Sequence, residues 1–148
     1  MARAVDTKEY LDMVCRLLAE GKRDVAVPVA GTSMCPFLRP EDTVYLEPVG
    51  EKLKKGRIYL FLRPNGRYVL HRLIRVESGG RLWMLGDSQR TPEPVADREL
   101  LRAQVSSGIR KGKPFTRSSL VWRFYAGPWR WLWRVRGPIS VLWEKLRR

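Results

Sequence analysis

Strand-like runs separated by tight turns fill the middle of this chain and most constrain how it can fold. Pro64-Asn65-Gly66 and Glu77-Ser78-Gly79-Gly80 are turn sequences, and Asn and Gly tolerate the positive φ angles of a hairpin. Short connections favour neighbouring antiparallel strands. We therefore predict a mainly β (α+β) fold with a curled, barrel-like antiparallel sheet within residues 25–113. The predicted strands are Val25–Ala30, Thr43–Pro48, Arg57–Arg63, Tyr68–Val76, Arg81–Gly86 and a segment around Leu100–Arg110.

The N-terminal segment, residues 1–24, has the pattern of one amphipathic helix. Asp6 and Glu9 have the spacing of a capping box, in which each side chain satisfies a free N–H at the helix start. Gly21 is expected to end the helix. The apolar stripe that predicts packing against the sheet consists of Tyr10, Leu11, Val14, Leu17 and Leu18.

The C-terminal segment, residues 114–148, differs from the rest in composition. It holds five of the six tryptophans and carries eight basic residues against one acid, Glu144. Gly127-Pro128 and Gly137-Pro138 predict three short helical pieces.

Three interpretations of this segment stay open. Its tryptophans could pack on the sheet, or residues 117–148 could lie on an anionic membrane surface, where tryptophan and arginine suit the headgroup layer. The third is capture of an acidic peptide or a nucleic acid. Nucleic acid ranks last, because no nucleic-acid fold signature accompanies these residues.

Composition narrows the class of protein further. A length of 148 residues suits one domain, and the net charge of +14 favours negatively charged partners. No stretch of 18 apolar residues occurs, and the N-terminus has no apolar signal core, so we expect a cytoplasmic protein that associates at most peripherally with a membrane. Cys15, Cys35 and one histidine form neither a disulfide framework nor a metal site, so no metal and no cofactor is predicted.

A serine and the single histidine are the candidate catalytic groups. Ser33 follows a strand-like run in a sharp Gly-Thr-Ser turn, and His71 lies inside another strand. Serine needs a base within hydrogen-bond reach, and a histidine with a pKa near ~6.5 is mostly neutral at pH 7 and can accept its proton. A third group usually orients such a histidine. Asp87 and Glu93 are both candidates for that role, and the sequence leaves the choice open.

These residues occur in an ordered set of motifs. Gly31-Thr32-Ser33-Met34-Cys35-Pro36, with the segment Leu38 through Val44 after it, resembles the serine box of the signal peptidase I superfamily and of the related SOS-repressor autoproteases. The later motifs resemble the remaining boxes in order: Lys55-Gly56-Arg57-Ile58-Tyr59-Leu60-Phe61, Val69-Leu70-His71-Arg72, and Gly86-Asp87-Ser88 with Pro92-Glu93-Pro94-Val95. A histidine as base is the pattern of the endoplasmic-reticulum and archaeal type of signal peptidase, whereas most bacterial enzymes carry lysine.

The chain also departs from that pattern. Glu41 replaces a usual glycine, Arg57 a usual aspartate and Ser88 a usual asparagine; Glu93 stands where aspartate is common, and the usual transmembrane anchor is missing.

The resemblance implies a serine endopeptidase that cleaves leader or signal-type peptides with small residues before the cut. Ser33 would be the nucleophile, His71 the base, and Asp87 or Glu93 the orienting acid. The substrate is expected to lie extended along a strand edge. The alternative is a module that keeps the fold without activity and binds a peptide or a membrane surface through its basic aromatic tail.

Overall fold

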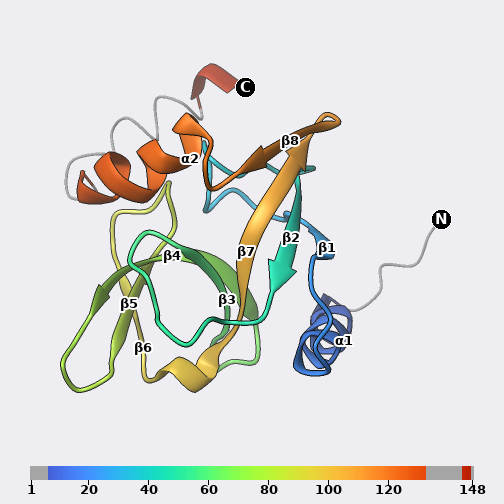
Figure 1. Ribbon diagram of the computed structural model, residues 1–148. Helices are drawn as coiled ribbons and strands as arrows, with labels where there is room; N and C mark the ends of the chain where they lie inside the picture. The colour runs from blue at the N-terminus through green and yellow to red at the C-terminus, as the bar shows by residue number, and fades with distance from the viewer. Residues whose placement is uncertain (1–6, 133–144, 148) are drawn as a thin grey trace.

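Eight antiparallel strands form one open sheet in the computed structural model, which describes residues 7–132 and 145–147 (Figure 1). The strand order is β1-β2-β7-β3-β4-β5-β6, and β8 pairs with β7. The end strands β1 and β6 do not pair, so the sheet does not close into a barrel. The predicted mainly β, antiparallel fold is confirmed. The strands are β1 (Val25–Pro28), β2 (Thr43–Glu47), β3 (Ile58–Leu62), β4 (Tyr68–Val76), β5 (Leu82–Leu85), β6 (Glu93–Val95), β7 (Leu101–Arg110) and β8 (Lys113–Thr116).

The strand β7 is the centre of the sheet. One of its edges pairs with β2, while its other edge pairs first with β3 and then with β8. Strands β6 and β8 were not predicted. Each contains a proline, which removes a backbone donor and weakens a strand signal, yet each lies at an edge where that donor is not needed.

The predicted N-terminal helix is α1 (Thr7–Ala19). Leu11, Val14 and Leu18 of its apolar stripe are buried in the core. Gly21, at φ +91°, ends the helix: its N–H donates to the Leu18 carbonyl, and the N–H of Lys22 donates to the Leu17 carbonyl. This is the glycine-terminated pattern that satisfies the last carbonyls of a helix. Asp6, the other half of the predicted capping box, lies outside the described residues.

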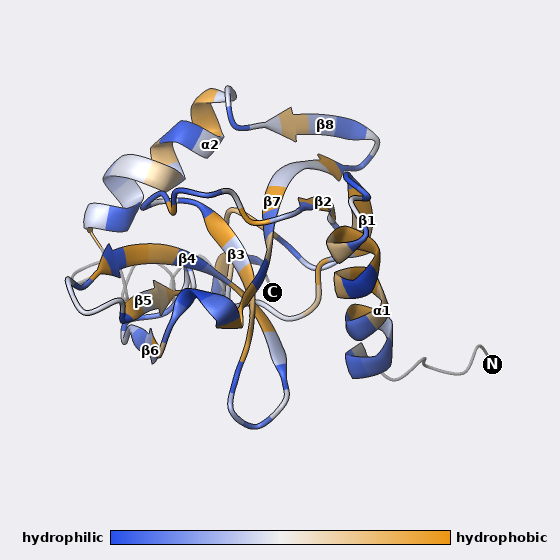
Figure 2. Ribbon diagram, turned by 60° about the horizontal axis from the view of Figure 1, so that its bottom comes forward, coloured by the Kyte–Doolittle hydropathy of each residue, from blue (hydrophilic) through white to orange (hydrophobic). Residues whose placement is uncertain are grey.

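The predicted hairpin at Asn65-Gly66 joins β3 to β4. Gly66 has φ +84°, and the Asn65 side chain accepts a hydrogen bond of 3.0 Å from the N–H of Arg67. Both residues therefore stabilise the turn as predicted, Gly66 through its positive φ and Asn65 through its side-chain hydrogen bond. Hydrophobic segments of β3 and β4 stand out in Figure 2, and buried side chains of both strands belong to the core.

The C-terminal segment packs partly on the sheet. Helix α2 (Leu120–Phe124) continues into the π-helical stretch η2 (Tyr125–Trp129), which runs through Gly127-Pro128 where we expected a boundary. Trp122 and Trp129 are buried, whereas Trp131 is 76% exposed. Trp133, Trp143 and Gly137-Pro138 lie outside the described residues.

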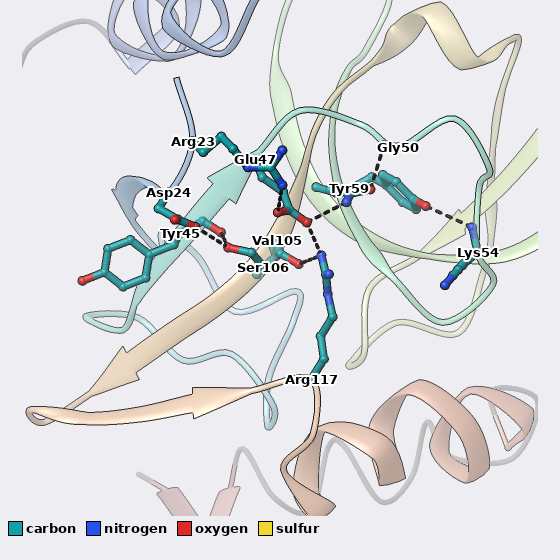
Figure 3. A network of polar contacts seen from close by, with 11 residues as sticks. Arg23, Asp24, Tyr45, Glu47, Gly50, Lys54, Tyr59, Val105, Ser106 and Arg117 are labelled. Atoms are coloured by element: carbon teal, nitrogen blue, oxygen red, sulfur yellow. Dashed lines mark hydrogen bonds and ion pairs between the residues drawn. The ribbon is translucent and has the colours of Figure 1, made fainter. Parts of the chain in front are cut away.

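Glu47 joins segments from both ends of the chain (Figure 3). Its carboxylate accepts hydrogen bonds from Arg23 before β1 at 2.9 Å, from Gln104 on β7 at 2.7 Å and from Arg117 after β8 at 2.6 Å. Burial opposes ionisation of this side chain, but the hydrogen bonds from Gln104, Arg117 and Arg23 outweigh it and lower the pKa of Glu47.

None of the helices described here has the length and apolar character needed to cross a bilayer. The described residues also contain no group of three or more side chains that could ligate a metal ion.

Candidate active site

Ser33 and His71 line the same cavity, of about 500 Å³. Ser33 lies in the turn after β1, and His71 lies on β4, opposite Tyr59 of β3. The fold thus brings the two predicted residues, far apart in sequence, to one site. In the described part of the chain no hydrogen bond joins them. Catalytic hydrogen bonds are often long in an empty site and tighten when substrate binds.

Two contacts fix the turn that carries Ser33. The Ser33 carbonyl accepts hydrogen bonds of 3.0 Å from both the N–H and the hydroxyl of Ser88, after β5. At the far end of the turn, the buried Asp42 carboxylate accepts hydrogen bonds from the Arg110 guanidinium of β7 at 2.7 Å and from the N–H of Arg39 at 2.9 Å. The serine is therefore held by backbone and side-chain contacts on both sides.

Gly86 allows the two loops to approach. A Cβ at this position would lie 2.4 Å from the Ser33 carbonyl oxygen, closer than real Cβ atoms come to anything. Only glycine leaves room for the turn in its present place.

The His71 ring is uncharged in this environment. Its side chain is 1% exposed. Burial lowers the pKa of His71 to about 4; the nearby Glu93 carboxylate partly opposes this, and the Arg63 guanidinium adds to it. At pH 7 the ring is uncharged and able to accept a proton.

Glu93 is the carboxylate beside the histidine. Its Oε1 lies 3.1 Å from His71 Nδ1, although this contact does not have hydrogen-bond alignment. Arg63 of the loop after β3 holds Glu93 with two hydrogen bonds, of 3.0 and 2.6 Å. With Nδ1 turned toward Glu93, Nε2 is the ring nitrogen left to face the cavity.

Asp87 has a different partner. Its fully buried carboxylate receives two hydrogen bonds from Arg72, at 2.9 and 2.7 Å. Arg72 also donates to the Gly56 carbonyl at 2.6 Å, and Trp129 of the C-terminal helix donates to the Asp87 carbonyl at 3.0 Å. These contacts anchor the loop that carries Gly86 and Ser88.

Sequence reasoning overlooked the supporting residues Arg63 and Arg72 and assigned no role to Ser88. Arg72 and Ser88 lie within the quoted motifs, next to His71 and Asp87, and that position was the available signal. Arg63 lies outside the motifs, and nothing in its sequence context distinguished it.

The walls of the cavity are mostly apolar. They come from α1, the end of β1, the Ser33 turn, β3 and the first half of β4. The apolar lining residues are Leu11, Val27, Val29, Met34, Leu60, Val69 and Leu70. Such a lining favours an apolar side chain of a bound chain over a charged one.

A comparison with family models matches residues 2–104 to the family described as Peptidase S24-like. No curated protein and no solved structure matches the chain. The family match covers more than half of the chain and spans α1, the Ser33 turn, the His71 strand and Glu93. From this match, the chain belongs to the Peptidase S24-like family, a family of peptidases.

Proposed function

We propose that the protein is a serine endopeptidase with Ser33 as nucleophile and His71 as general base. One observation carries the proposal: Ser33 and a buried, neutral His71 line one cavity, with a carboxylate 3.1 Å from the far ring nitrogen. Membership of a peptidase family makes hydrolysis of a peptide bond the relevant chemistry.

The proposed reaction uses Ser33 and His71 in turn. Ser33 Oγ attacks the scissile carbonyl carbon while its proton passes to His71 Nε2, and the carbonyl oxygen takes up the negative charge. Collapse of this intermediate breaks the C–N bond, and the imidazolium returns the proton to the leaving amine. Water, activated by the same ring, then releases the acyl group from Ser33.

The proposed donor for the developing oxyanion is a backbone N–H of the turn. Within the described residues the backbone N–H of Ser33 donates to no other group, so it is free to receive this charge. One well-placed donor of this kind contributes roughly 3 kcal/mol to transition-state stabilisation.

Glu93 is the orienting acid in this proposal. Its negative charge raises the pKa of His71 against the effect of burial, which helps the imidazolium to form during attack. Asp87, by contrast, directs both carboxylate oxygens at Arg72. We assign Asp87 the role of holding the Ser33 turn in place through its loop.

The substrate is proposed to bind as an extended strand. β1 ends the sheet, and β4 pairs with β5 only from Arg72 onward, so its Tyr68–His71 half has an unpaired edge. Both of these edges border the cavity. An extended peptide can add to such edges through its backbone while an apolar side chain enters the cavity.

We propose leader or signal-type peptides as the substrates, as the signal peptidase resemblance implies. These peptides present an unstructured stretch with apolar residues, which suits an apolar cavity between strand edges.

Incubation with a library of leader-type peptides tests the activity. We expect cleavage by the wild type and a loss of about 10³-fold or more in Ser33→Ala and in His71→Ala. Ser78→Ala, a serine in an exposed turn, is the matched control and should cleave like the wild type. Unchanged cleavage by Ser33→Ala would contradict the proposal. Peptide binding without cleavage by either protein would instead support an inactive binding module.

The pH profile of kcat/KM distinguishes the two acids. In Glu93→Gln the His71 ring loses its neighbouring negative charge and keeps Arg63, so the acid limb should move to lower pH and kcat should fall by roughly 10²-fold. Asp87→Asn should leave the acid limb in place and lower the free energy of unfolding by about 3 kcal/mol, because Arg72 loses a buried partner. The opposite pattern would make Asp87 the orienting acid.

A further inference from the structure

A second recess, of about 920 Å³, shares no lining residue with the Ser33–His71 cavity. It is lined by three cations and two indole rings: Lys55, Arg75 and Arg130, with Trp83 and Trp131. It lies between the second half of β4, β5 and residues 130–131, which follow η2. The peptidase mechanism above uses none of these side chains.

Within residues 7–132 and 145–147, no carboxylate pairs with the cations of the recess. Arg130 is partly buried, and that burial, together with the nearby Arg72, lowers its pKa. The sequence from residue 100 to residue 143 contains no acidic residue at all. The recess is therefore suited to an anion from outside the chain.

Exposed apolar side chains are concentrated in the C-terminal segment of the described chain, and Val76 and Trp131 line the recess itself. Of the eight large hydrophobic residues that are exposed in the described chain, six lie between residues 120 and 146. A seventh, Val76, lines the recess, as does Trp131. The six are Leu120, Val121, Phe124, Trp131, Leu132 and Leu146. Val76 and Trp131 therefore give the recess exposed apolar surface beside its cations, a combination that suits an interaction surface.

We propose that this face docks on a lipid bilayer that contains anionic phospholipids. Lipid phosphate groups would bind Lys55, Arg75 and Arg130, while Trp131 and its apolar neighbours enter the headgroup layer. A bilayer supplies both the anions that the recess needs and the apolar layer that the exposed side chains need. A soluble acidic peptide supplies only the first, which is why we favour the bilayer.

The position of the recess adds a functional consequence. Thr91 and Pro92 line it, whereas Gln89 of the same loop lines the Ser33–His71 cavity. Docking would therefore hold the proposed catalytic cavity close to the membrane surface, where peptides with apolar segments accumulate.

Co-sedimentation of the full chain with vesicles tests the proposal. We expect binding to vesicles of phosphatidylcholine with 30% phosphatidylglycerol (roughly −1 charge per anionic lipid) and little binding to pure phosphatidylcholine. Lys55→Glu with Arg75→Glu, both at exposed positions, should weaken binding by at least about 25-fold, because each cation contributes about fivefold. Trp131→Ser with Leu132→Ser should also weaken it by about tenfold or more.

Matched controls lie on α1 and in the turn directly after it, and α1 is on another side of the molecule from α2 in both Figure 1 and Figure 2. Arg16→Glu with Lys22→Glu makes the same change in net charge, and Met13→Ser removes an exposed apolar side chain of comparable exposure. Both should retain most of the vesicle binding.

Three results would overturn the proposal. In the first, the wild type shows no binding that depends on phosphatidylglycerol. In the second, the α1 and recess variants lose binding equally. In the third, the protein binds polyglutamate or inorganic phosphate but does not bind vesicles. Cleavage of soluble peptides should be unchanged in the recess variants, so failure here and failure of the peptidase proposal are distinguishable. Deleting residues 117–148 is a poorer test, because it also removes the buried Trp122 and Trp129.

Discussion

Glu41 shows at the residue scale why a departure from the family pattern matters. The signal peptidase resemblance leads us to expect glycine at this position, and the backbone of Glu41 has φ +79°, in the left-handed region that favours glycine. The conformation follows from the tight connection between the Ser33 turn and β2, where the Asp42 N–H donates to the Arg39 carbonyl at 3.0 Å. The chain therefore carries a strained residue near its candidate active site.

Glu41→Gly should relieve this strain. We expect the free energy of unfolding to rise by about 1 kcal/mol, since an L-residue in this region costs more than the extra backbone entropy of glycine. The side chain is exposed, so its loss removes little packing. Chemical denaturation measures the change, with Glu41→Gln as the control that removes the charge and keeps the strain. Destabilisation by Glu41→Gly would show that the side chain contributes more than the backbone costs.

At the scale of elements, the site is built by two loops that touch. The turn after β1 carries Ser33, and the loop after β5 carries Gly86, Asp87 and Ser88. Arg72 of β4 holds the second loop through Asp87, and Ser88 holds the first through the Ser33 carbonyl. The position of the serine thus depends on packing between elements, while the chain around it supplies only the turn.

Gly86→Ala should separate activity from folding. The added Cβ would meet the Ser33 carbonyl at 2.4 Å, so the turn has to move. A displacement of about 1 Å at a catalytic group costs about 10²-fold in rate, and we expect a loss of that size in kcat/KM. Gly79→Ala, where nothing lies within 4 Å of the new Cβ, is the matched control and should keep full activity. Equal activity of the two variants would mean that the contact does not position Ser33.

Element by element, strong local signals were sufficient for most of the fold. The turn Asn65-Gly66 and the apolar run after it predicted β4 with its observed bounds, and Gly21 ended α1 as expected. The strands β6 and β8 were not predicted because they contain Pro94 and Pro114. A strand tolerates proline only at an edge of the sheet, and the local sequence does not show which strands lie at an edge.

The same limit applied to the proposed orienting acid and to the stretch from α2 through η2. Asp87 and Glu93 could not be told apart because the distinction depends on which arginine each one meets, Arg72 or Arg63. At Gly127-Pro128 the local breaker signal was strong, yet the chain stays helical there by widening into a π-helical stretch that ends in the buried Trp129.

For the whole molecule, acid should weaken the fold in two overlapping steps. The folded-state pKa of His71, about 4, lies below its ordinary value of 6.5, so the unfolded chain binds a proton that the folded chain does not. Stability is then fully present above pH 6.5 and falls as the pH drops toward 4. The lowered pKa of Glu47 adds a loss that starts near the ordinary value of 4.5 and continues at lower pH, because its stabilising contribution disappears as the carboxylate becomes protonated.

Thermal or chemical unfolding at pH 7 and pH 5 checks the first step. The free energy of unfolding should fall by about 2 kcal/mol over this interval, at constant ionic strength. His71→Asn lacks the titrating ring. Whatever its stability at pH 7, its free energy of unfolding should therefore change much less between pH 7 and pH 5 than that of the wild type. A slope that persists in His71→Asn would place the titrating group elsewhere.

The buried pair of Arg72 and Asp87 has one more consequence. Neighbouring residues of a strand point to opposite faces, so His71 and Arg72 place the proposed base on one side of β4 and the anchor of the Ser33 turn on the other. The proposed base and the loop that holds the proposed nucleophile are therefore both attached to the same stretch of β4. When the surrounding loops move, the His71 ring and the Ser33 hydroxyl would move together. Their relative alignment would then be kept during motions that change the rest of the cavity.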